Sequence, residues 1–290
     1  MKNENYPEWK KTNHGKEVMQ RLCKNRMAIA GLVFILFLFL VAAFADLIAP
    51  YDYAAQDFTA TFRWPGAGHL LGTDNLGRDI LTRLIYGTRI SLKIALLSVA
   101  ISSVIGITLG AIAGYYGGII DNLLMRFLDI YQSIPVLILS IAIATSLGPG
   151  VTNTIIALAI SVCPQYARLM RASIMTVRDK EYIEAAKSIN AGDGRIILRH
   201  VVPNALSPMI VSITMSIGSS MLTAATLSFV GLGAQPPSPE WGAMLTAAKT
   251  YIRDYPYMIT APGVCIMLSV LSFNVLGDGL RDALDPRLKN

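Results

Sequence analysis

The chain has 290 residues, of which 53% are hydrophobic and only 15% are charged, and its formal net charge is +6. A soluble domain usually carries nearer a quarter charged residues, and several apolar runs here reach the roughly 20 residues that a membrane-spanning helix needs. The composition therefore excludes a soluble globular domain and indicates an integral membrane protein. Because basic residues in membrane proteins usually report orientation, the positive charge does not indicate nucleic-acid binding.

The apolar runs predict an all-α membrane protein with six transmembrane helices. The first run is unambiguous. The fourth is the weakest, because its apolar part is short and ends at Pro164, so we expect it to continue into the basic segment that follows. The predicted spans are residues 27–48, 91–114, 128–147, 151–164, 205–230 and 258–277.

An even number of spans places both termini on the same side of the membrane. Eighteen Lys and Arg residues lie in the tails and loops on that side, and six lie in the loops on the other side. The positive-inside rule therefore predicts that both termini are cytoplasmic. Residues 43–45, Ala-Phe-Ala, have the form of a signal-peptide cleavage site. However, the apolar run before them is longer than a signal core, so we expect an uncleaved first span.

Three glycines repeat at four-residue spacing in the second span, at Gly106, Gly110 and Gly114. Small residues on one helical face let another helix approach closely, which is how helices associate in lipid. The partner could be a helix of the same chain or a second subunit, and packing within the chain is favoured.

An acidic residue, Asp129, lies at the start of the third span, three residues after Arg126. Carboxylates within a membrane are functional candidates by default. Here the position at the cytoplasmic edge, with Arg126 within helical reach, favours a structural ion pair over a proton relay.

Two long loops lie on the outer side of the predicted topology. The first contains turn-forming Gly and Asp residues and then ILTRLIYGTRIS, which is typical of a short amphipathic helix leading into the second span. The second opens with a rigid Pro-rich stretch, and Trp241 follows where we expect a residue of the membrane-interface aromatic belt. The length of both loops favours shaped external surfaces over simple connectors.

A long basic segment, Gln165–Asn204, separates the fourth and fifth spans. Apolar residues at helical spacing predict a helix over 179–190, a break over 190–194 and a second short helix that begins at Arg195 and ends before Pro203. The small residues Ala185 and Ala186 permit close approach by a partner. Such a segment indicates docking onto a soluble protein, with a helix lying on the membrane surface as the alternative.

The fifth span mixes hydroxyl side chains with apolar ones. These hydroxyls could line a water-filled path or could hydrogen-bond back to carbonyl groups of their own helix. The candidates for lining a path are Ser212, Ser216, Ser220 and Thr223.

Motifs for catalysis or cofactor binding are missing from the sequence. There is no G-x-x-x-x-G-K-[ST] phosphate-binding loop, no zinc-binding HExxH and no Ser/His/Asp or Cys/His set. The three cysteines are far apart, and the three histidines fall in different segments, so we expect no disulfide framework and no metal site. We therefore predict no catalytic, cofactor-binding or metal-binding residues in this chain.

Five motifs of the sequence resemble those of a known family. EAAKSINAGDGRIILRHVVPN is similar to the coupling loop of type I ABC importer permeases. LGTDNLGRD, YARLMRA, LSFVGLGAQPPSPEWGAML and GDGLRDALDPRL resemble the C-type permease subunit of dipeptide, oligopeptide and nickel importers. The resemblance extends from about the first span to the end of the chain.

The resemblance implies a permease bundle of six transmembrane helices in a bacterial or archaeal cell (inner) membrane, surrounded by lipid. It also implies an arrangement along the chain. A cytoplasmic tail covers 1–26, the first span with its extracytoplasmic loop covers 27–90, the transmembrane domain covers 91–279 with the coupling loop at 165–204, and a second cytoplasmic tail covers 280–290.

The resemblance further implies partners. They are a second homologous permease, one or two ABC ATPase subunits that bind ATP and Mg, and an extracytoplasmic substrate-binding protein. Catalysis would belong to the ATPases. The residues that match the ATPase-docking loop are Glu184, Ala185, Ala186, Asn190, Ala191, Arg195, His200 and Pro203.

One departure from the family pattern falls in this loop. The family usually has Gly six residues after the Glu, where this chain has Asn190. Gly serves there because the chain leaves the helix with positive φ, and Asn is the commonest substitute. We therefore expect the turn to be retained.

Other interpretations compete with the importer permease. An ion-coupled secondary transporter would need ionisable groups at mid-membrane, whereas most of the predicted spans are nearly free of charge at their centres. An intramembrane enzyme would need His or carboxylate clusters, and a structural scaffold would show no dependence on ATP. Among importer substrates, di- or oligopeptides are favoured, nickel or a metal chelate is the alternative, and glutathione-like compounds also fit.

Overall fold

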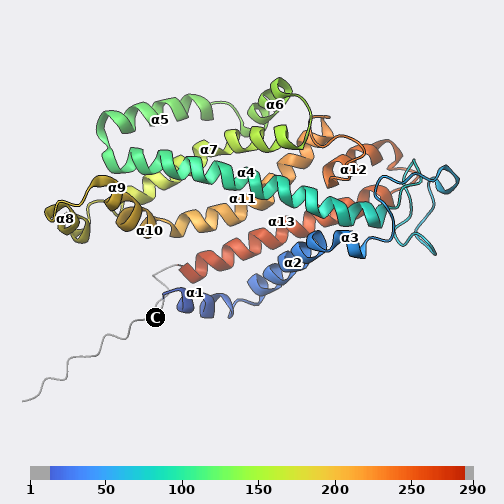
Figure 1. Ribbon diagram of the computed structural model, residues 1–290, viewed down its shortest axis with the longest axis horizontal. Coiled ribbons are helices and arrows are strands. Elements are labelled where there is room, and N and C mark those ends of the chain that lie inside the picture. The colour runs from blue at the N-terminus through green and yellow to red at the C-terminus, as the bar shows by residue number, and fades with distance from the viewer. Residues whose placement is uncertain (1–13, 285–290) are drawn as a thin grey trace, which may run out of the picture.

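The computed structural model describes residues 14–284, and all the regular elements in this range are helical. They form an elongated bundle (Figure 1). The short helices α8–α10 lie at one end, and α12 lies at the other with the long loop before α4. The helices are α1 His14–Leu22, α2 Arg26–Ala43, α3 Ala45–Ile48, α4 Ile80–Tyr116, α5 Gly118–Gln132, α6 Val136–Leu147, α7 Val151–Met175, α8 Glu181–Ser188, α9 Asp193–Ile196, α10 Val202–Ala205, α11 Ser207–Phe229, α12 Trp241–Ala248 and α13 Tyr257–Leu284.

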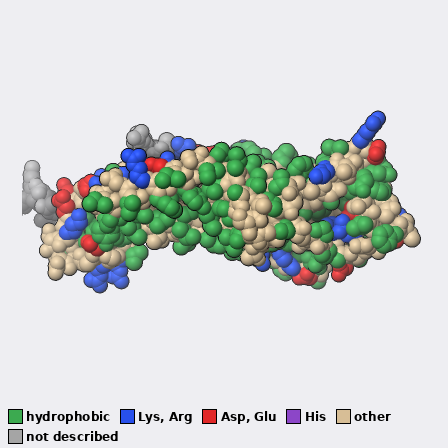
Figure 2. Space-filling view, turned by 90° about the horizontal axis from the view of Figure 1, so that it is seen from above, with side chains coloured by type: hydrophobic (Ala, Val, Ile, Leu, Met, Phe, Trp, Pro, Cys, Tyr) green, Lys and Arg blue, Asp and Glu red, His purple; other side chains and the backbone are tan. Residues whose placement is uncertain are grey.

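The all-α prediction is confirmed, and the number of spans is compatible with six. Within residues 14–284, α2, α4, α11 and α13 are long and apolar enough to cross a membrane. The pair α5 and α6 makes a fifth such unit if it is counted as one broken span. Figure 2 shows hydrophobic side chains over the middle of the visible face, with charged side chains gathered toward the two ends.

The predicted third span, 128–147, is wrong as a single helix, and residues 115–127, which separate the second and third predicted spans, are helical except at Gly117. The chain is already helical from Gly118, and α5 and α6 meet at an angle of 85°. Pro135 lies at the break, where proline disfavours helical geometry in the preceding residue and supplies no N–H of its own. Apolar content marked this segment as a candidate span, but it did not reveal the bend.

The predicted fourth span corresponds to the first half of α7. As expected, the helix continues into the basic segment, and Pro164 lies inside it. Pro164 and Tyr166 are both buried. Packing on neighbouring helices therefore stabilises α7 through the proline.

The longest element is α4, with 37 residues. The predicted second span, 91–114, is its inner part, and the amphipathic helix expected before it is continuous with it. This helix crosses the expected domain boundary at residue 90. Asp79 caps its first turn by accepting from the Thr82 amide at 2.7 Å, and Gly117, with φ of +65°, ends it.

The glycine face of α4 packs against α7 of the same chain, so the favoured interpretation is confirmed. A Cβ built at Gly106 would overlap the Tyr166 side chain, and one built at Gly110 would overlap the Ala167 carbonyl oxygen. The two helices therefore approach more closely than any side chain at these glycines would allow.

The first span and the tail before it hold more structure than predicted. The predicted span 27–48 is divided at Phe44 into α2 and α3. Asn25 caps α2, because its side-chain oxygen accepts from the amides of Met27 and Ala28, both at 3.1 Å. The expected tail 1–26 contains α1, which packs against α13 through Leu22. The rest of that tail, 1–13, and most of the tail 280–290 lie outside the described residues.

Two loops fold together at the end opposite α8, and we call them the loop lobe (residues 49–79 and 231–256). Arg78 and Asp74 form a buried pair, with Nε and Oδ2 2.7 Å apart. Arg83 of α4 joins both halves of the lobe, because its guanidinium donates to the Tyr53 carbonyl at 3.0 Å and to the Pro237 carbonyl at 3.3 Å. The expected shaped surface is therefore an ordered structure built on buried charge.

Trp241 is buried inside the protein and does not present its ring to a surrounding membrane interface, which corrects the prediction. Its side chain is 1% exposed, and its indole N–H donates to the Leu84 carbonyl of α4 at 3.1 Å. The neighbouring Glu240 is also buried. Its carboxylate caps α12 and accepts from the Ser228 hydroxyl at 2.7 Å, so α11, α12 and α4 meet at this point.

Candidate functional site

The basic segment between α7 and α11 extends beyond the end of the bundle, and we call residues 176–206 the docking loop (Figure 1). Its first helix, α8, has two faces. Ile183 and Ala186 are buried in a core shared with α7, whereas Glu184 and Ala185 are exposed. The side chain of Ala186 therefore faces the interior of this chain and is not available to a partner, contrary to the expectation for this residue.

The turn after α8 is a Schellman motif centred on Asn190. Its φ is +57°, as expected for a position that usually holds Gly. The Asn190 amide donates to the Lys187 carbonyl at 2.9 Å, and the Ala191 amide donates to the Ala186 carbonyl at 3.2 Å. These two bonds satisfy helix-end carbonyls in the pattern of this motif. Asn190 itself is exposed, and Ala191 packs partly against the core.

The second half of the docking loop is helical through Pro203, so the prediction that it ends before this proline is wrong. α9 passes into a π-helical turn, Ile197–Val201, and then into α10, where Pro203 lies in the first turn. A proline is tolerated there because a first-turn N–H has no partner within the helix. Arg195 and Pro203 are exposed and His200 is half-buried.

Ion pairs hold α5 against α7 beside this loop. Asp129 pairs with Arg168 of α7, with Nη2 and Oδ1 2.8 Å apart, and not with Arg126 as predicted. The partner comes from a different helix, because α5 begins ten residues before the predicted span and lies beside α7. Asp121 forms a second, more buried pair with Arg171.

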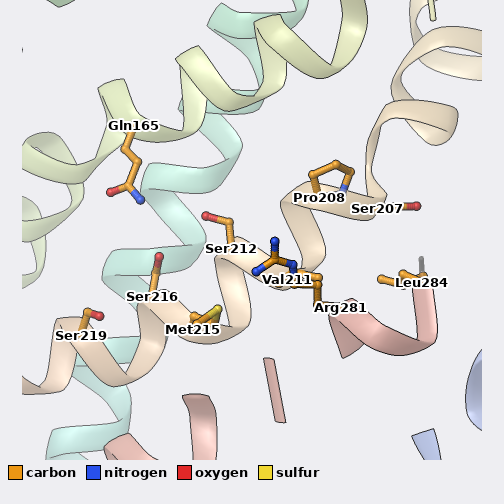
Figure 3. A pocket seen from close by; sticks show the side chains of 10 residues that line it. All are labelled: Gln165, Ser207, Pro208, Val211, Ser212, Met215, Ser216, Ser219, Arg281 and Leu284. Atoms are coloured by element: carbon orange, nitrogen blue, oxygen red, sulfur yellow. The ribbon is translucent and has the colours of Figure 1, made fainter. Parts of the chain in front are cut away.

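A cavity of about 610 Å³ opens between α7, α11 and α13 (Figure 3). Its polar lining consists mainly of hydroxyl groups from α11. None of the lining residues described is acidic. The lining residues are Gln165, Ser207, Pro208, Val211, Ser212, Met215, Ser216, Ser219, Arg281 and Leu284.

Of the four predicted path-lining residues, two line the cavity and two do not. Ser212 and Ser216 lie on the cavity wall. Ser220 is only 4% exposed and lies outside the lining, and the Thr223 hydroxyl donates to the Ser219 carbonyl at 3.0 Å. Both alternatives considered for these hydroxyls are thus present on α11, and Thr223 lies about two turns beyond Ser216 on the same face of the helix.

Two polar lining residues were missed from the sequence. Gln165 comes from α7, and Arg281 points from α13 into the same cavity (Figure 3). Gln165 directly follows the buried Pro164 in an otherwise apolar stretch, which was a signal that could have been used. Arg281 carried no such signal, since a basic residue after the last span is also expected from topology alone.

Comparison with known proteins now identifies the family. Residues 106–290 match the family described as the inner membrane component of binding-protein-dependent transport systems. Residues 14–65 match the N-terminal transmembrane domain of oligopeptide transport permease C. The chain belongs to the family of binding-protein-dependent transport system inner membrane components.

Similar members of this family are permease proteins of bacteria. The dipeptide transport system permease of Alkalihalophilus pseudofirmus is 46% identical over 95% of this chain and 90% of that protein. The di/tripeptide permease of Pseudomonas aeruginosa is 48% identical over 95% of this chain and 93% of its own length. The glutathione permease of Pectobacterium atrosepticum is 44% identical over 95% of this chain and 92% of its own length.

Solved structures of ABC transporters share the fold of this family member. An inward-facing structure of the methionine transporter MetNI superposes with a TM-score of 0.58 at 20% identity, covering 71% of this chain and 98% of that one. A structure of an amino acid ABC transporter with histidines superposes with a TM-score of 0.55 at 19% identity, covering 70% of this chain and 95% of that one. At these identities the likeness shows the fold alone.

Membership of this family makes the chain a multi-pass inner-membrane permease, a channel component and not itself an enzyme. Across residues 14–284, no group of three or more His, Cys, Asp or Glu side chains is placed to hold a metal ion.

Proposed function

We propose that this permease forms half of the translocation pathway of an ATP-driven importer for di- or oligopeptides. A second homologous permease would form the other half. One or two ABC ATPase subunits would bind ATP and Mg, and an extracytoplasmic binding protein would deliver the substrate. Both termini and the docking loop would be cytoplasmic, and the loop lobe would face the binding protein.

The observation that carries this proposal is the docking loop. It extends past the bundle with Glu184, Ala185 and the Asn190 turn exposed, while Ile183 and Ala186 anchor it to the same core as α7. A partner that moves this surface would therefore move α7 directly. Arg195, His200 and Pro203 would add contacts on the second half of the loop.

The expected division of the chain fits this role with one adjustment. The domain over 91–279 would form the pathway, and the segment 27–90 would add a peripheral helix and half of the loop lobe. The end of α4 belongs to both, because α4 starts at Ile80. The pathway would run past Ser212 and Ser216, whose hydroxyls can replace water around polar peptide groups without binding one side chain tightly.

Two kinds of relative support a peptide substrate. Dipeptides and di/tripeptides are named for the permeases of Alkalihalophilus pseudofirmus and Pseudomonas aeruginosa, and glutathione, itself a tripeptide, for that of Pectobacterium atrosepticum. Nickel or a metal chelate is the less favoured cargo.

The experiment is uptake in proteoliposomes that contain the complex purified with this chain. We expect ATP-dependent accumulation of a labelled dipeptide, blocked when ATP hydrolysis is blocked. Accumulation of nickel but not of dipeptide would replace the peptide proposal, and uptake driven by an ion gradient without ATP would overturn the importer.

A charge reversal tests the docking role of the loop. Glu184→Lys changes an exposed residue, so we expect normal membrane insertion but reduced recovery of the ATPase and reduced uptake. Lys24→Glu, a reversal of an exposed charge outside the docking loop, is the control. Normal ATPase recovery and uptake with Glu184→Lys would remove this residue from the docking surface.

A further inference from the structure

The inner end of α4 is joined to the docking loop by one tyrosine. The Tyr115 hydroxyl donates to the Asp193 carboxylate at 2.9 Å, and the Lys187 ammonium lies 5.7 Å from the centre of the Tyr115 ring. Lys187 belongs to α8 and Asp193 to α9, on opposite sides of the Asn190 turn. One side chain of α4 therefore contacts both halves of the docking loop.

A second contact lies beside it. The Arg178 guanidinium, between α7 and α8, donates to the Gly114 carbonyl at 2.9 Å. This carbonyl is in the last turn of α4, where carbonyl groups lack partners within the helix. These contacts matter because the docking loop is covalently continuous with α7 and α11 but not with α4. Any displacement of the loop reaches the end of α4 only through noncovalent contacts.

The outer end of α4 is held by the loop lobe. Trp241 donates to the Leu84 carbonyl, and Arg83 donates to the Pro237 carbonyl. Farther along, the Ser91 hydroxyl bonds to the Glu240 carboxylate at 3.3 Å and accepts from the Trp241 amide at 3.2 Å. Both halves of the lobe are thus fastened to the first three turns of this one helix.

Between these two ends α4 is one uninterrupted helix. Its 37 residues contain no proline, and at 1.5 Å per residue they extend about 55 Å. Packing on α7 through the glycine face holds α4 laterally. The contacts of Tyr115 and Arg178, in contrast, join the end of the helix to the docking loop.

We propose that Tyr115 is the positioning residue that fastens the docking loop to α4, and that α4 carries displacement of this loop to the loop lobe. The inference rests on the proposed function, since it takes the loop as the ATPase side and the lobe as the side of the binding protein. It adds a direct route between the two partners that bypasses α11 and the cavity.

The test uses the complete complex in proteoliposomes, with ATP hydrolysis measured before and after addition of peptide-loaded binding protein. Tyr115→Phe removes the hydroxyl that reaches Asp193 but keeps the ring beneath Lys187. We expect unchanged ATPase recovery and basal hydrolysis, with the stimulation by loaded binding protein falling by about threefold to tenfold, the range of one exposed hydrogen bond. Asp193→Ala, a change within the docking loop itself, should lower the ratio of stimulated to basal hydrolysis by the same factor.

A double-mutant cycle and a matched control sharpen the result. If both residues act through one bond, Tyr115→Phe with Asp193→Ala will lower the stimulation no further than either change alone. Tyr116→Phe, an exposed neighbour, should leave the stimulation unchanged.

Two outcomes would overturn the inference. Unchanged stimulation in Tyr115→Phe would mean that the loop does not act through this contact. Loss of the ATPase from the purified complex, with an unchanged ratio of stimulated to basal hydrolysis in what remains, would make Tyr115 a structural or docking residue. Failure of the proposed function itself is distinguishable, because the unmodified complex would then show no stimulation by peptide-loaded binding protein.

Discussion

The two ends of the bundle are built on different physical principles. At the loop lobe, charged groups are buried and paired. The side chains of Arg78 and Asp74 are 7% and 10% exposed, and Glu240 is 1% exposed. At the docking end, Arg168 and Asp129 are 51% and 52% exposed, and the helices of the loop are short. The pair of Arg171 and Asp121 is more buried there, at 29% and 12% exposed, but it is still more exposed than the pair in the lobe.

This difference indicates how each end responds to a partner. A buried network loses much stability if one member is removed, so it holds a single arrangement. Exposed pairs in high dielectric contribute little and exchange partners at little cost. The loop lobe is therefore suited to present a fixed surface, while the docking end can rearrange when a partner changes its shape.

The strongest way to break this comparison is to remove the acid at the centre of the lobe. Asp74→Ala leaves Arg78 buried without its partner and removes the acceptor for the Leu76 and Arg78 amides. We expect a loss of about 3–5 kcal/mol of stability. The measurement is the melting temperature of the detergent-solubilised protein, together with protease sensitivity of residues 49–79. A melting temperature within experimental error of the unmodified protein would contradict the account of a locked lobe.

Between the two ends, the contact of α4 with α7 can be tested at Gly110. Gly110→Ala adds a methyl group where the Ala167 carbonyl and the Met170 Cβ already lie, so the helices must separate. We expect a loss of about 1–3 kcal/mol, measured in the same melting experiment. Gly192→Ala is the matched control, because nothing lies within 4 Å of its Cβ position. Equal melting temperatures for the two variants would show that the close approach is not required.

A smaller effect is expected at the turn of the docking loop. Asn190→Val places a β-branched residue at a φ of +57°, which costs about 1–2 kcal/mol and should increase proteolysis of the loop. Asn190→Gly should preserve the turn and the uptake activity, because glycine adopts positive φ without strain. If Asn190→Val resists proteolysis as well as Asn190→Gly does, the Schellman turn does not order this loop.

The smallest effect should come from the exposed ion pair of the docking end. Asp129→Ala should change stability by less than about 1 kcal/mol, and raising the salt concentration should reduce the difference further. The melting temperatures of Asp129→Ala and Asp74→Ala, measured in the same buffer, compare the exposed pair of the docking end with the buried pair of the loop lobe. A loss as large as that of Asp74→Ala would mean that the two ends are equally rigid.

Local pattern recognition succeeded where a feature depended on neighbouring residues. The extension of α7 past Pro164 and the close-packing role of Gly106, Gly110 and Gly114 followed from residue type and spacing. The positive φ of Asn190 followed from the resemblance to a family that usually has Gly at this position. Local pattern recognition failed where distant segments decide the outcome. Asp129 was assigned to Arg126 because both are close in sequence, whereas α7 brings Arg168 nearer in space. Trp241 was assigned to an interface because it follows a Pro-rich loop. Its burial could not be predicted, because it depends on contact with α4, more than a hundred residues earlier.

By itself, the sequence determined that the protein is an all-α membrane protein, that it has a basic segment typical of the coupling loop, and which family it resembles. Hydrophobicity and turn chemistry are local properties, and the motifs are short. Only the tertiary structure decided which face of α8 is free, which serines of α11 reach the cavity, and that α4 joins the docking loop to the loop lobe. Each of these depends on which helices pack together, because a neighbouring helix decides whether a given side chain is buried, paired or exposed.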